Sequence, residues 1–314
     1  MEIFTQSTFD RWPLEDKSVQ AIITSPPYFG LRKYEIPDVT IGNWKGQYGL
    51  EPTIQLYIEH TLLWCKEAWR VLKDDGVFFL NIGDSYGGSW GDYAGHSRGG
   101  NRWIRKGGIK KEKPPTADAT KKCKLLVPHR VAIALVDLGW TLRNDIVWHK
   151  ENSMPESVSD RFSKKFEMVF MFMKQRKYQF DLDAVKIPFT EPERIYNAKT
   201  STHKGAQIEN RAYKGLHDGR QKYGDIEKGK NPGDVWIIPT SPSPDAHYAM
   251  WPEKLVERML LCSTRPGDVI LDPFAGSGTT LRVADKHNRI AYGIDLGYQE
   301  IQKRRMTGIQ KNLL

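Results

Sequence analysis

The stretch Thr24-Ser25-Pro26-Pro27-Tyr28 combines residue types that could bind a flat ring carrying an amino group. An apolar run at residues 19–23 precedes it and predicts a buried strand. Two consecutive prolines end that strand, because they donate no backbone hydrogen bond and their φ angles are fixed, so nearby carbonyl groups stay free and rigid. The Ser25 hydroxyl and a carbonyl could accept hydrogen bonds from an amine, and Tyr28 could stack on its ring. A simple proline turn is the alternative for this stretch alone.

Residues 269–295 predict a strand, a tight loop, a helix and a second strand, which together form a βαβ unit. Gly276 and Gly278 lack side chains, so a ligand could approach the loop backbone closely. Asp295 ends the second strand about 20 residues further on, which is the spacing expected of a carboxylate that binds ribose hydroxyl groups. These features predict a cofactor site, and a purely structural crossover is the alternative.

The two stretches lie far apart in the chain, so the fold has to bring two strand ends together. In a doubly wound sheet, loops at the carboxyl ends of neighbouring strands meet where the strand order reverses. Helical spacing of apolar residues predicts helices at 53–72, 127–138 and 252–263 that cover such a sheet. Residues 144–148 and 166–173 predict two further strands.

Composition limits the class of protein. The chain has 314 residues and a formal charge of +9, which allows one large α/β domain with an insertion and suits a polyanionic partner. Its three cysteines have no metal-like spacing, and an odd count argues against a disulfide framework, so we expect no metal and a cytoplasmic protein. No leader and no apolar run of about 18 residues is present, so we expect no membrane span.

Together, the Ser-Pro-Pro-Tyr stretch and the sequence Asp272–Thr280 resemble the amino-methyltransferases of DNA, and their order resembles the β class. The resemblance implies an α/β, doubly wound, mostly parallel seven-stranded sheet with an antiparallel hairpin, circularly permuted, plus a target-recognition insertion. It also implies a division into a catalytic part at 1–186, a target-recognition segment at 187–230 and a cofactor-binding part of the same domain at 231–314.

The same resemblance implies S-adenosyl-L-methionine as the cofactor. The residues that it assigns to cofactor binding are Trp251, Pro252, Asp272, Phe274, Ala275, Gly276, Ser277, Gly278, Thr279 and Asp295. The family usually carries a Gly-Asp pair after the first strand, where this chain has Thr5-Gln6-Ser7-Thr8. The acid is therefore missing, and Gln6 or Ser7 is the candidate to replace it.

The catalytic residues implied by the resemblance are Ser25, Pro26, Pro27 and Tyr28. Serine in place of aspartate favours the N4 amine of cytosine in duplex DNA, with adenine N6 or an RNA target as alternatives. Carbon-5 methylation is not expected, because no Pro-Cys nucleophile motif occurs. A non-catalytic DNA-binding module is the alternative from another class of protein.

Three polar regions are candidates for contact with DNA: the basic loop 87–124, the segment 149–155 and the target-recognition segment. Solvated surface loops are the alternative for each. The individual residues that we predict to contact DNA are Arg32, Arg102, Trp103, Arg105, Asn152, Lys204, Arg211 and Arg220. We also expect a monomer or weak dimer and a possible restriction endonuclease that acts on the same site.

Overall fold

A computed structural model describes residues 1–34, 36–88, 119–153, 155–188, 229–240 and 251–297. The chain divides into two compact units. The larger unit contains Met1–Phe180 and Asp234–Leu314, and the smaller contains Asp181–Gly233. The described part of the smaller unit has a short 3-10 helix, η3 (Asp183–Val185), and an antiparallel bridge between Ile187 and Lys230. The segment predicted to recognise the target lies almost entirely outside the described residues, so that assignment stays a prediction.

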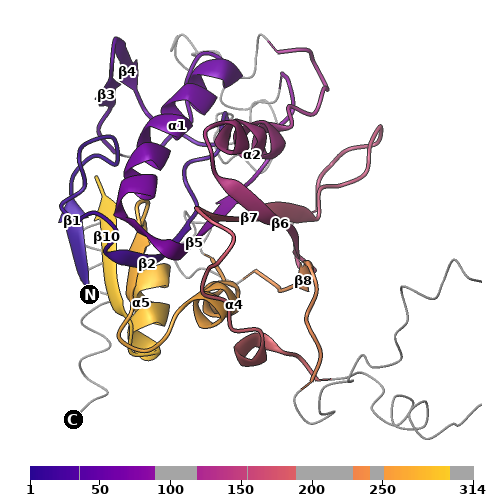
Figure 1. The fold of residues 1–314 in the computed structure, drawn as a ribbon. Helices are drawn as coiled ribbons and strands as arrows, with labels where there is room; N and C mark the ends of the chain where they lie inside the picture. Colours follow the sequence, from indigo (N-terminus) through magenta and orange to yellow (C-terminus); the bar gives the residue numbers. More distant parts are fainter. Residues whose placement is uncertain (35, 89–118, 154, 189–228, 241–250, 298–314) are drawn as a thin grey trace, which may run out of the picture. The chain divides into compact units, whose positions relative to one another are not determined.

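The larger unit is built on one sheet whose strand order is β1-β10-β9-β2-β5-β7-β6-β8 (Figure 1). Its strands are β1 (Glu2–Thr5), β2 (Val19–Thr24), β5 (Leu72–Ile82), β6 (Thr141–His149), β7 (Phe166–Met173), β8 (Val235–Ile237), β9 (Val269–Asp272) and β10 (Ile290–Asp295). Every pairing is parallel except the two made by β7. The doubly wound sheet with an antiparallel hairpin is thus confirmed. The three-residue edge strand β8 makes eight strands in place of the seven predicted.

Helices cover both faces of the sheet. Figure 1 shows α1 (Ile54–Val71) and α2 (Val127–Asp137) on one face, and α4 (Glu253–Ser263) and α5 (Thr279–Lys286) on the other. Strand β2 is buried along its whole length, which explains why its sequence is mostly apolar on both faces rather than alternating. A separate small hairpin joins β3 (Val39–Ile41) to β4 (Trp44–Gly46). Within the described residues, none of the helices combines the length and the apolar character needed to cross a bilayer.

Thr53 is the N-cap of α1, since its side chain accepts a hydrogen bond from the backbone of Leu56. The helix buries Trp64, Cys65 and Ala68 toward the sheet, where the Trp64 ring meets Phe78 of β5 edge to face. This packing fixes the position of α1, and the last turn of α1 in turn holds the loop between β1 and β2.

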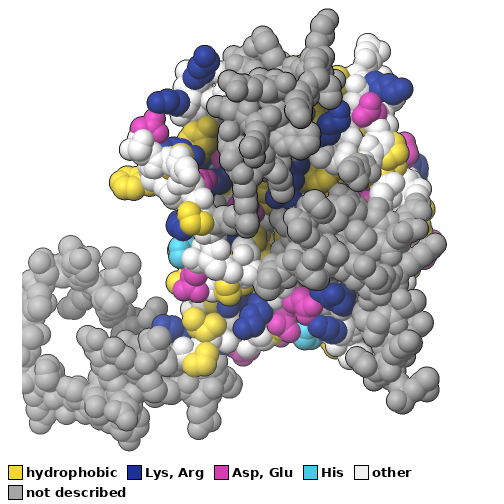
Figure 2. All heavy atoms as spheres, turned by 180° about the vertical axis from the view of Figure 1, so that it is seen from behind, with side chains coloured by type: hydrophobic (Ala, Val, Ile, Leu, Met, Phe, Trp, Pro, Cys, Tyr) yellow, Lys and Arg dark blue, Asp and Glu magenta, His cyan; other side chains and the backbone are white. Residues whose placement is uncertain are grey.

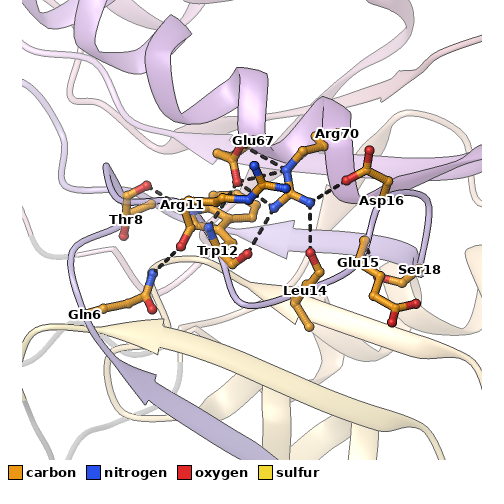
Figure 3. Close-up of polar contacts among 10 residues, drawn as sticks. All are labelled: Gln6, Thr8, Arg11, Trp12, Leu14, Glu15, Asp16, Ser18, Glu67 and Arg70. Carbon is orange, nitrogen blue, oxygen red and sulfur yellow. Dashed lines mark hydrogen bonds and ion pairs between the residues drawn. The ribbon is translucent and has the colours of Figure 1, made fainter.

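The loop between β1 and β2 is held on α1 by Arg70 (Figure 3). The Arg70 guanidinium donates to the carbonyls of Trp12 and Leu14 and to the carboxylates of Asp16 and Glu67, at 2.7–3.1 Å. The backbone of Trp12 also donates to Glu67 at 3.0 Å. Buried Trp12 then donates its indole hydrogen to the carbonyl of Thr8 at 2.9 Å. The guanidinium thereby determines where the start of the loop lies.

Replacing Arg70 should destabilise the protein, because Arg70→Met removes the guanidinium group that donates to two carbonyls and to the partly buried Glu67 carboxylate. We expect the free energy of unfolding to fall by about 3 kcal/mol, the size of a buried hydrogen bond to a charged group. Chemical denaturation measures this loss. The control is Lys66→Met, which makes a similar change on the exposed side of the same helix and should alter stability by less than about 0.5 kcal/mol. Equal stabilities of the two variants would contradict this role of Arg70.

Candidate active site

Strands β2 and β9 are neighbours in the sheet, so the two sequence stretches that could carry chemistry meet at its carboxyl edge. Ala21 pairs with Ile270 and Ile22 with Leu271. Just beyond this register, the Thr24 hydroxyl donates to Asp272 Oδ1 at 2.7 Å. A direct hydrogen bond therefore joins two segments that are 248 residues apart in the chain.

Both stretches open into one cavity of about 520 Å³. Most of the predicted site residues line it: Ser25, Pro26, Pro27, Tyr28, Arg32, Asn152, Trp251, Asp272, Phe274, Ala275, Gly276, Ser277, Thr279 and Asp295. Pro252 and Gly278 do not. Pro252 is the N-cap of α4, and Gly278 has a φ of 78°, a left-handed conformation that turns the chain into α5. In the structure, these two residues thus set the backbone conformation at the start of a helix and do not line the cavity.

Asp272 is a buried junction between the two halves of the site. Its Oδ1 also accepts from the backbone of Phe274 at 3.1 Å, and its Oδ2 accepts from the Thr280 hydroxyl at 2.7 Å. Burial raises the pKa of Asp272 to about 6, although the hydrogen bonds from Thr24 and Thr280 oppose the rise. One carboxylate therefore holds the end of β2, the glycine loop and the first turn of α5 together.

Asp295 lies at the end of β10 and faces the glycine loop. Its carboxylate accepts from the backbone of Gly276 at 2.7 Å and of Gly297 at 2.8 Å. Burial raises the pKa of Asp295 to about 6. Because the loop residue Gly276 has a φ of 49°, its backbone adopts a left-handed conformation in which its N–H reaches the carboxylate. Asp295 is thus a half-buried acceptor at the cavity wall, and its contact with ribose hydroxyl groups stays a prediction.

The structure distinguishes Gln6 from Ser7, the two candidates to replace the missing acid. Gln6 donates its amide to the carbonyl of Arg11 and does not line the cavity, whereas Ser7 lines it together with Thr8 and Phe9. The Thr8 hydroxyl donates to the carbonyl of Pro273 at 2.7 Å, which ties this wall to the glycine loop. Sequence reasoning missed Thr8 and Phe9, and no motif marked them.

The wall beyond Phe9 is aromatic. Tyr48 lies between the Phe9 ring, which it meets edge to face at 5.3 Å, and the Phe274 ring, which it stacks on at 5.6 Å. Sequence reasoning also missed Tyr48, because it lies in a loop without a recognisable pattern. These rings give the half of the cavity beside the glycine loop a flat apolar surface.

The Ser-Pro-Pro-Tyr stretch presents polar atoms to the other half of the cavity. The Ser25 hydroxyl donates to the Tyr28 hydroxyl at 3.0 Å, so the lone pairs of Ser25 Oγ remain available. The Pro27 carbonyl is used, since it accepts from Tyr57 at 2.9 Å. By contrast, the Pro26 carbonyl has no hydrogen-bond donor among the described residues. Ser25 Oγ and the Pro26 carbonyl are therefore two acceptors that this stretch can offer to a ligand.

The Tyr28 ring lies against the backbone of Gly83. A Cβ atom added at Gly83 would lie 2.6 Å from two carbons of this ring, which no real contact allows. The Tyr28 hydroxyl reaches Asn81 Oδ1 at 2.8 Å and Glu167 Oε2 at 2.9 Å. The ring is thus fixed at one face and at its hydroxyl. Whether its other face stacks on a base stays a prediction.

The β6–β7 hairpin supplies another part of the wall through Trp148, Lys150 and Glu167. Lys150 pairs with Glu167, and its ammonium group lies 4.3 Å from the centre of the Trp148 ring. Asn152 lines the cavity, but its side-chain amide makes hydrogen bonds of 2.7 and 2.9 Å with the backbone of Thr240. These bonds give Asn152 a structural task, and its contact with DNA stays a prediction.

Six of the residues predicted to contact DNA lie outside the described residues: Arg102, Trp103, Arg105, Lys204, Arg211 and Arg220. Where the structure describes the chain, no group of three or more His, Cys, Asp or Glu side chains is placed to hold a metal ion.

Removing the hydrogen bond between Thr24 and Asp272 should weaken the junction. Thr24→Val keeps the shape of the side chain but leaves Asp272 Oδ1 with one donor in place of two. We expect the free energy of unfolding to fall by about 1–2 kcal/mol at neutral pH. Denaturant titration measures the change. Thr40→Val, in an exposed strand position, is the matched control, and a loss of the same size there would show that the effect belongs to threonine in strands generally.

Comparison with known proteins agrees with this geometry. A model of the DNA methylase family matches residues 19–304. The Type II methyltransferase M.SmaI of Serratia marcescens is 35% identical over 301 residues, covering 93% of this chain and 86% of that protein, and M.Cfr9I of Citrobacter freundii is 34% identical over 96% and 85%.

Solved structures share the fold at low identity. The cytosine-N4-specific PvuII DNA methyltransferase has a TM-score of 0.59 at 18% identity, with 95% of this chain and 83% of that chain covered. A putative DNA modification methylase of Thermus thermophilus, in complex with S-adenosyl-L-methionine, has a TM-score of 0.54 at 19% identity, with 98% and 93% covered. On the extent of the family match and the identity to its Type II relatives, this chain belongs to the DNA methylase family.

Proposed function

We propose that this protein transfers a methyl group from S-adenosyl-L-methionine to the exocyclic N4 amine of cytosine within a short site in duplex DNA. The observation that carries the proposal is the single cavity shared by the Ser-Pro-Pro-Tyr stretch and the glycine loop, with Thr24 bonded directly to Asp272. One half of this cavity suits a nucleoside cofactor and the other suits an amine. A methyl donor and an acceptor can therefore meet within it.

The residues of the cofactor half fit S-adenosyl-L-methionine. The carboxylate of Asp295 can accept hydrogen bonds from ribose hydroxyl groups, and the rings of Phe9, Tyr48 and Phe274 offer an apolar surface to a purine. When bound, the cofactor supplies a methyl group that its sulfonium centre activates for displacement. The protein then has to position the acceptor amine and make its lone pair available.

The amine is a poor nucleophile because its lone pair is delocalised into the ring. Two acceptors aimed at its N–H groups favour a tetrahedral nitrogen, which localises that pair. Ser25 Oγ and the Pro26 carbonyl are the acceptors that the structure leaves available for this task. Both interactions strengthen as positive charge develops on the nitrogen, so they stabilise the transition state more than the ground state.

The assignment to cytosine rests on Ser25 and on the likeness to the cytosine-N4-specific PvuII enzyme. Adenine N6 methylation uses the same chemistry and is the alternative that the experiment below separates. In either case the base has to leave the duplex, because a stacked base cannot reach a cavity of this kind.

Segments that carry many cations are the proposed contacts to the DNA backbone. Figure 2 shows acidic and basic side chains interspersed on the described surface that is visible in that view. In the sequence, residues 89–118 and 189–228 contain more Lys and Arg than Asp and Glu. We therefore assign phosphate contacts to these two segments and sequence recognition to 187–230. Two relatives are Type II methyltransferases, which supports a partner endonuclease that acts on the same site.

The test of the proposal is mass spectrometry of nucleosides from duplex DNA incubated with the protein and cofactor. We expect N4-methylcytosine, and N6-methyladenine alone would overturn the base assignment. Ser25→Ala should bind the cofactor normally but transfer methyl groups about a hundredfold more slowly, since it loses one acceptor. Ser157→Ala, at a position outside the cavity, is the control and should retain full activity.

Cofactor affinity should depend on pH through Asp295. Its pKa in the folded protein is about 6, so the carboxylate is protonated below that pH and ionised above it. Because the ionised form is the better acceptor for ribose hydroxyl groups, affinity should rise as pH increases through about 6 and then level off.

Calorimetric titration of the cofactor across a pH range that spans the pKa of Asp295 measures this dependence. Asp295→Asn should bind about ten- to a hundredfold more weakly at a pH well above that pKa. Any pH dependence that remains in this variant reports Asp272, whose pKa is also about 6. Asp137→Asn, on the exposed side of α2, is the control. Unchanged affinity of Asp295→Asn at the high end of the range would contradict the ribose assignment.

A further inference from the structure

We propose that Glu167 is the final acceptor of a proton path that starts at Ser25 and passes through the Tyr28 hydroxyl. The path would remove the proton that the target amine loses when it becomes methylated. This inference rests on the methyl transfer proposed above, and it applies to either target base.

The three groups form a continuous series of hydrogen bonds. Ser25 Oγ donates to the Tyr28 hydroxyl at 3.0 Å, and the Tyr28 hydroxyl donates to Glu167 Oε2 at 2.9 Å. All three residues line the same cavity, although Tyr28 and Glu167 are 139 residues apart in the chain. Every donor thus points from the amine end toward the carboxylate.

Asn81 competes for the single proton of Tyr28. Its Oδ1 lies 2.8 Å from the Tyr28 hydroxyl, and its amide nitrogen donates to the carbonyl of Met168 at 2.9 Å, which keeps Oδ1 turned toward Tyr28. A carboxylate is a stronger hydrogen-bond acceptor than a neutral amide. Asn81 therefore holds Tyr28 in place, whereas Glu167 is the group that can take its proton.

Two lysine side chains lie near the Glu167 carboxylate. Only 15% of its side chain is exposed, and its second oxygen pairs with Lys150, whose ammonium group also lies over the Trp148 ring. Lys164 is a further cation that acts on Glu167, and it donates to the carbonyl of Asp84 at 2.8 Å. A nearby cation stabilises a carboxylate in a partly desolvated site. Glu167 thus faces Tyr28 on one side and Lys150 on the other.

The proton balance of the step is complete. The amine nitrogen forms a bond to the methyl carbon, the bond from that carbon to sulfur breaks, and sulfur keeps the electron pair. The nitrogen releases one proton to Ser25 Oγ, which passes its own proton to Tyr28, which passes its own to Glu167. Ser25 and Tyr28 end unchanged, and the neutral Glu167 returns its proton to solvent after product leaves.

The experiment compares single-turnover methyl transfer with binding, using enzyme in excess over duplex DNA. Glu167→Gln keeps the size of the side chain but removes the charge that draws the proton. We expect the transfer rate to fall about a hundredfold, the usual contribution of a positioned base, while the affinities for cofactor and DNA stay within about twofold. Glu151→Gln makes the same chemical change at an exposed position outside the cavity and should leave the rate unchanged.

Tyr28→Phe provides a second, independent variant, because it interrupts the same path while Glu167 stays in place. We expect a similar loss of rate. The double variant should be no slower than either single variant, since one substitution already interrupts the path and the second causes no further loss of rate.

Three results would overturn the proposal: a wild-type rate in Glu167→Gln or Tyr28→Phe, losses that multiply in the double variant, or a loss of binding that parallels the loss of rate. If Glu167→Gln does not fold, the rate of Tyr28→Phe decides. An inactive wild-type protein would instead contradict the proposed function itself, so the two failures can be told apart.

Discussion

The hydrogen bond between Thr24 and Asp272 is the interaction on which the site depends. It lies at the carboxyl edge of the sheet, where β2 and β9 are neighbours, and it brings a proline-terminated strand to a glycine loop from the far end of the chain. The buried Asp272 carboxylate keeps its donors only if its neighbours stay in register, because Thr24, Phe274 and Thr280 supply them. A buried carboxylate without those donors would be costly, so the contact selects one relative position of the two loops.

Support for this junction extends well beyond the cavity. Arg70, at the end of α1, holds the loop after β1 through the carbonyls of Trp12 and Leu14. Trp12 then bonds to Thr8, and Thr8 bonds to Pro273, the residue next to Asp272. This series of contacts runs from a partly exposed guanidinium to the cavity wall beside the glycine loop. It fixes a segment that contains no recognisable cofactor motif of its own.

The direction of β7 determines the chemistry of the opposite wall. Because β7 runs antiparallel to β5 and β6, its first residues lie at the same edge as the carboxyl ends of the parallel strands. Glu167 is therefore placed beside Tyr28, even though a parallel strand in that position would have presented its other end. The antiparallel strand thus adds a carboxylate, with its partner Lys150, to a site whose other groups are mostly neutral.

Sequence alone determined the two motifs, the βαβ unit with its terminal acid, and the class of fold, because apolar runs, prolines and glycines act locally on the backbone. It could not determine which side chains face each other across the cavity. Gln6 and Ser7 looked equivalent in sequence, but only Ser7 lines the wall, since Gln6 bonds to its own loop. Glu167 carried no signal, because its role depends on the pairing of β7 with β5 and on the orientation of Tyr28. Long-range register, which no local pattern encodes, decided the place of Glu167.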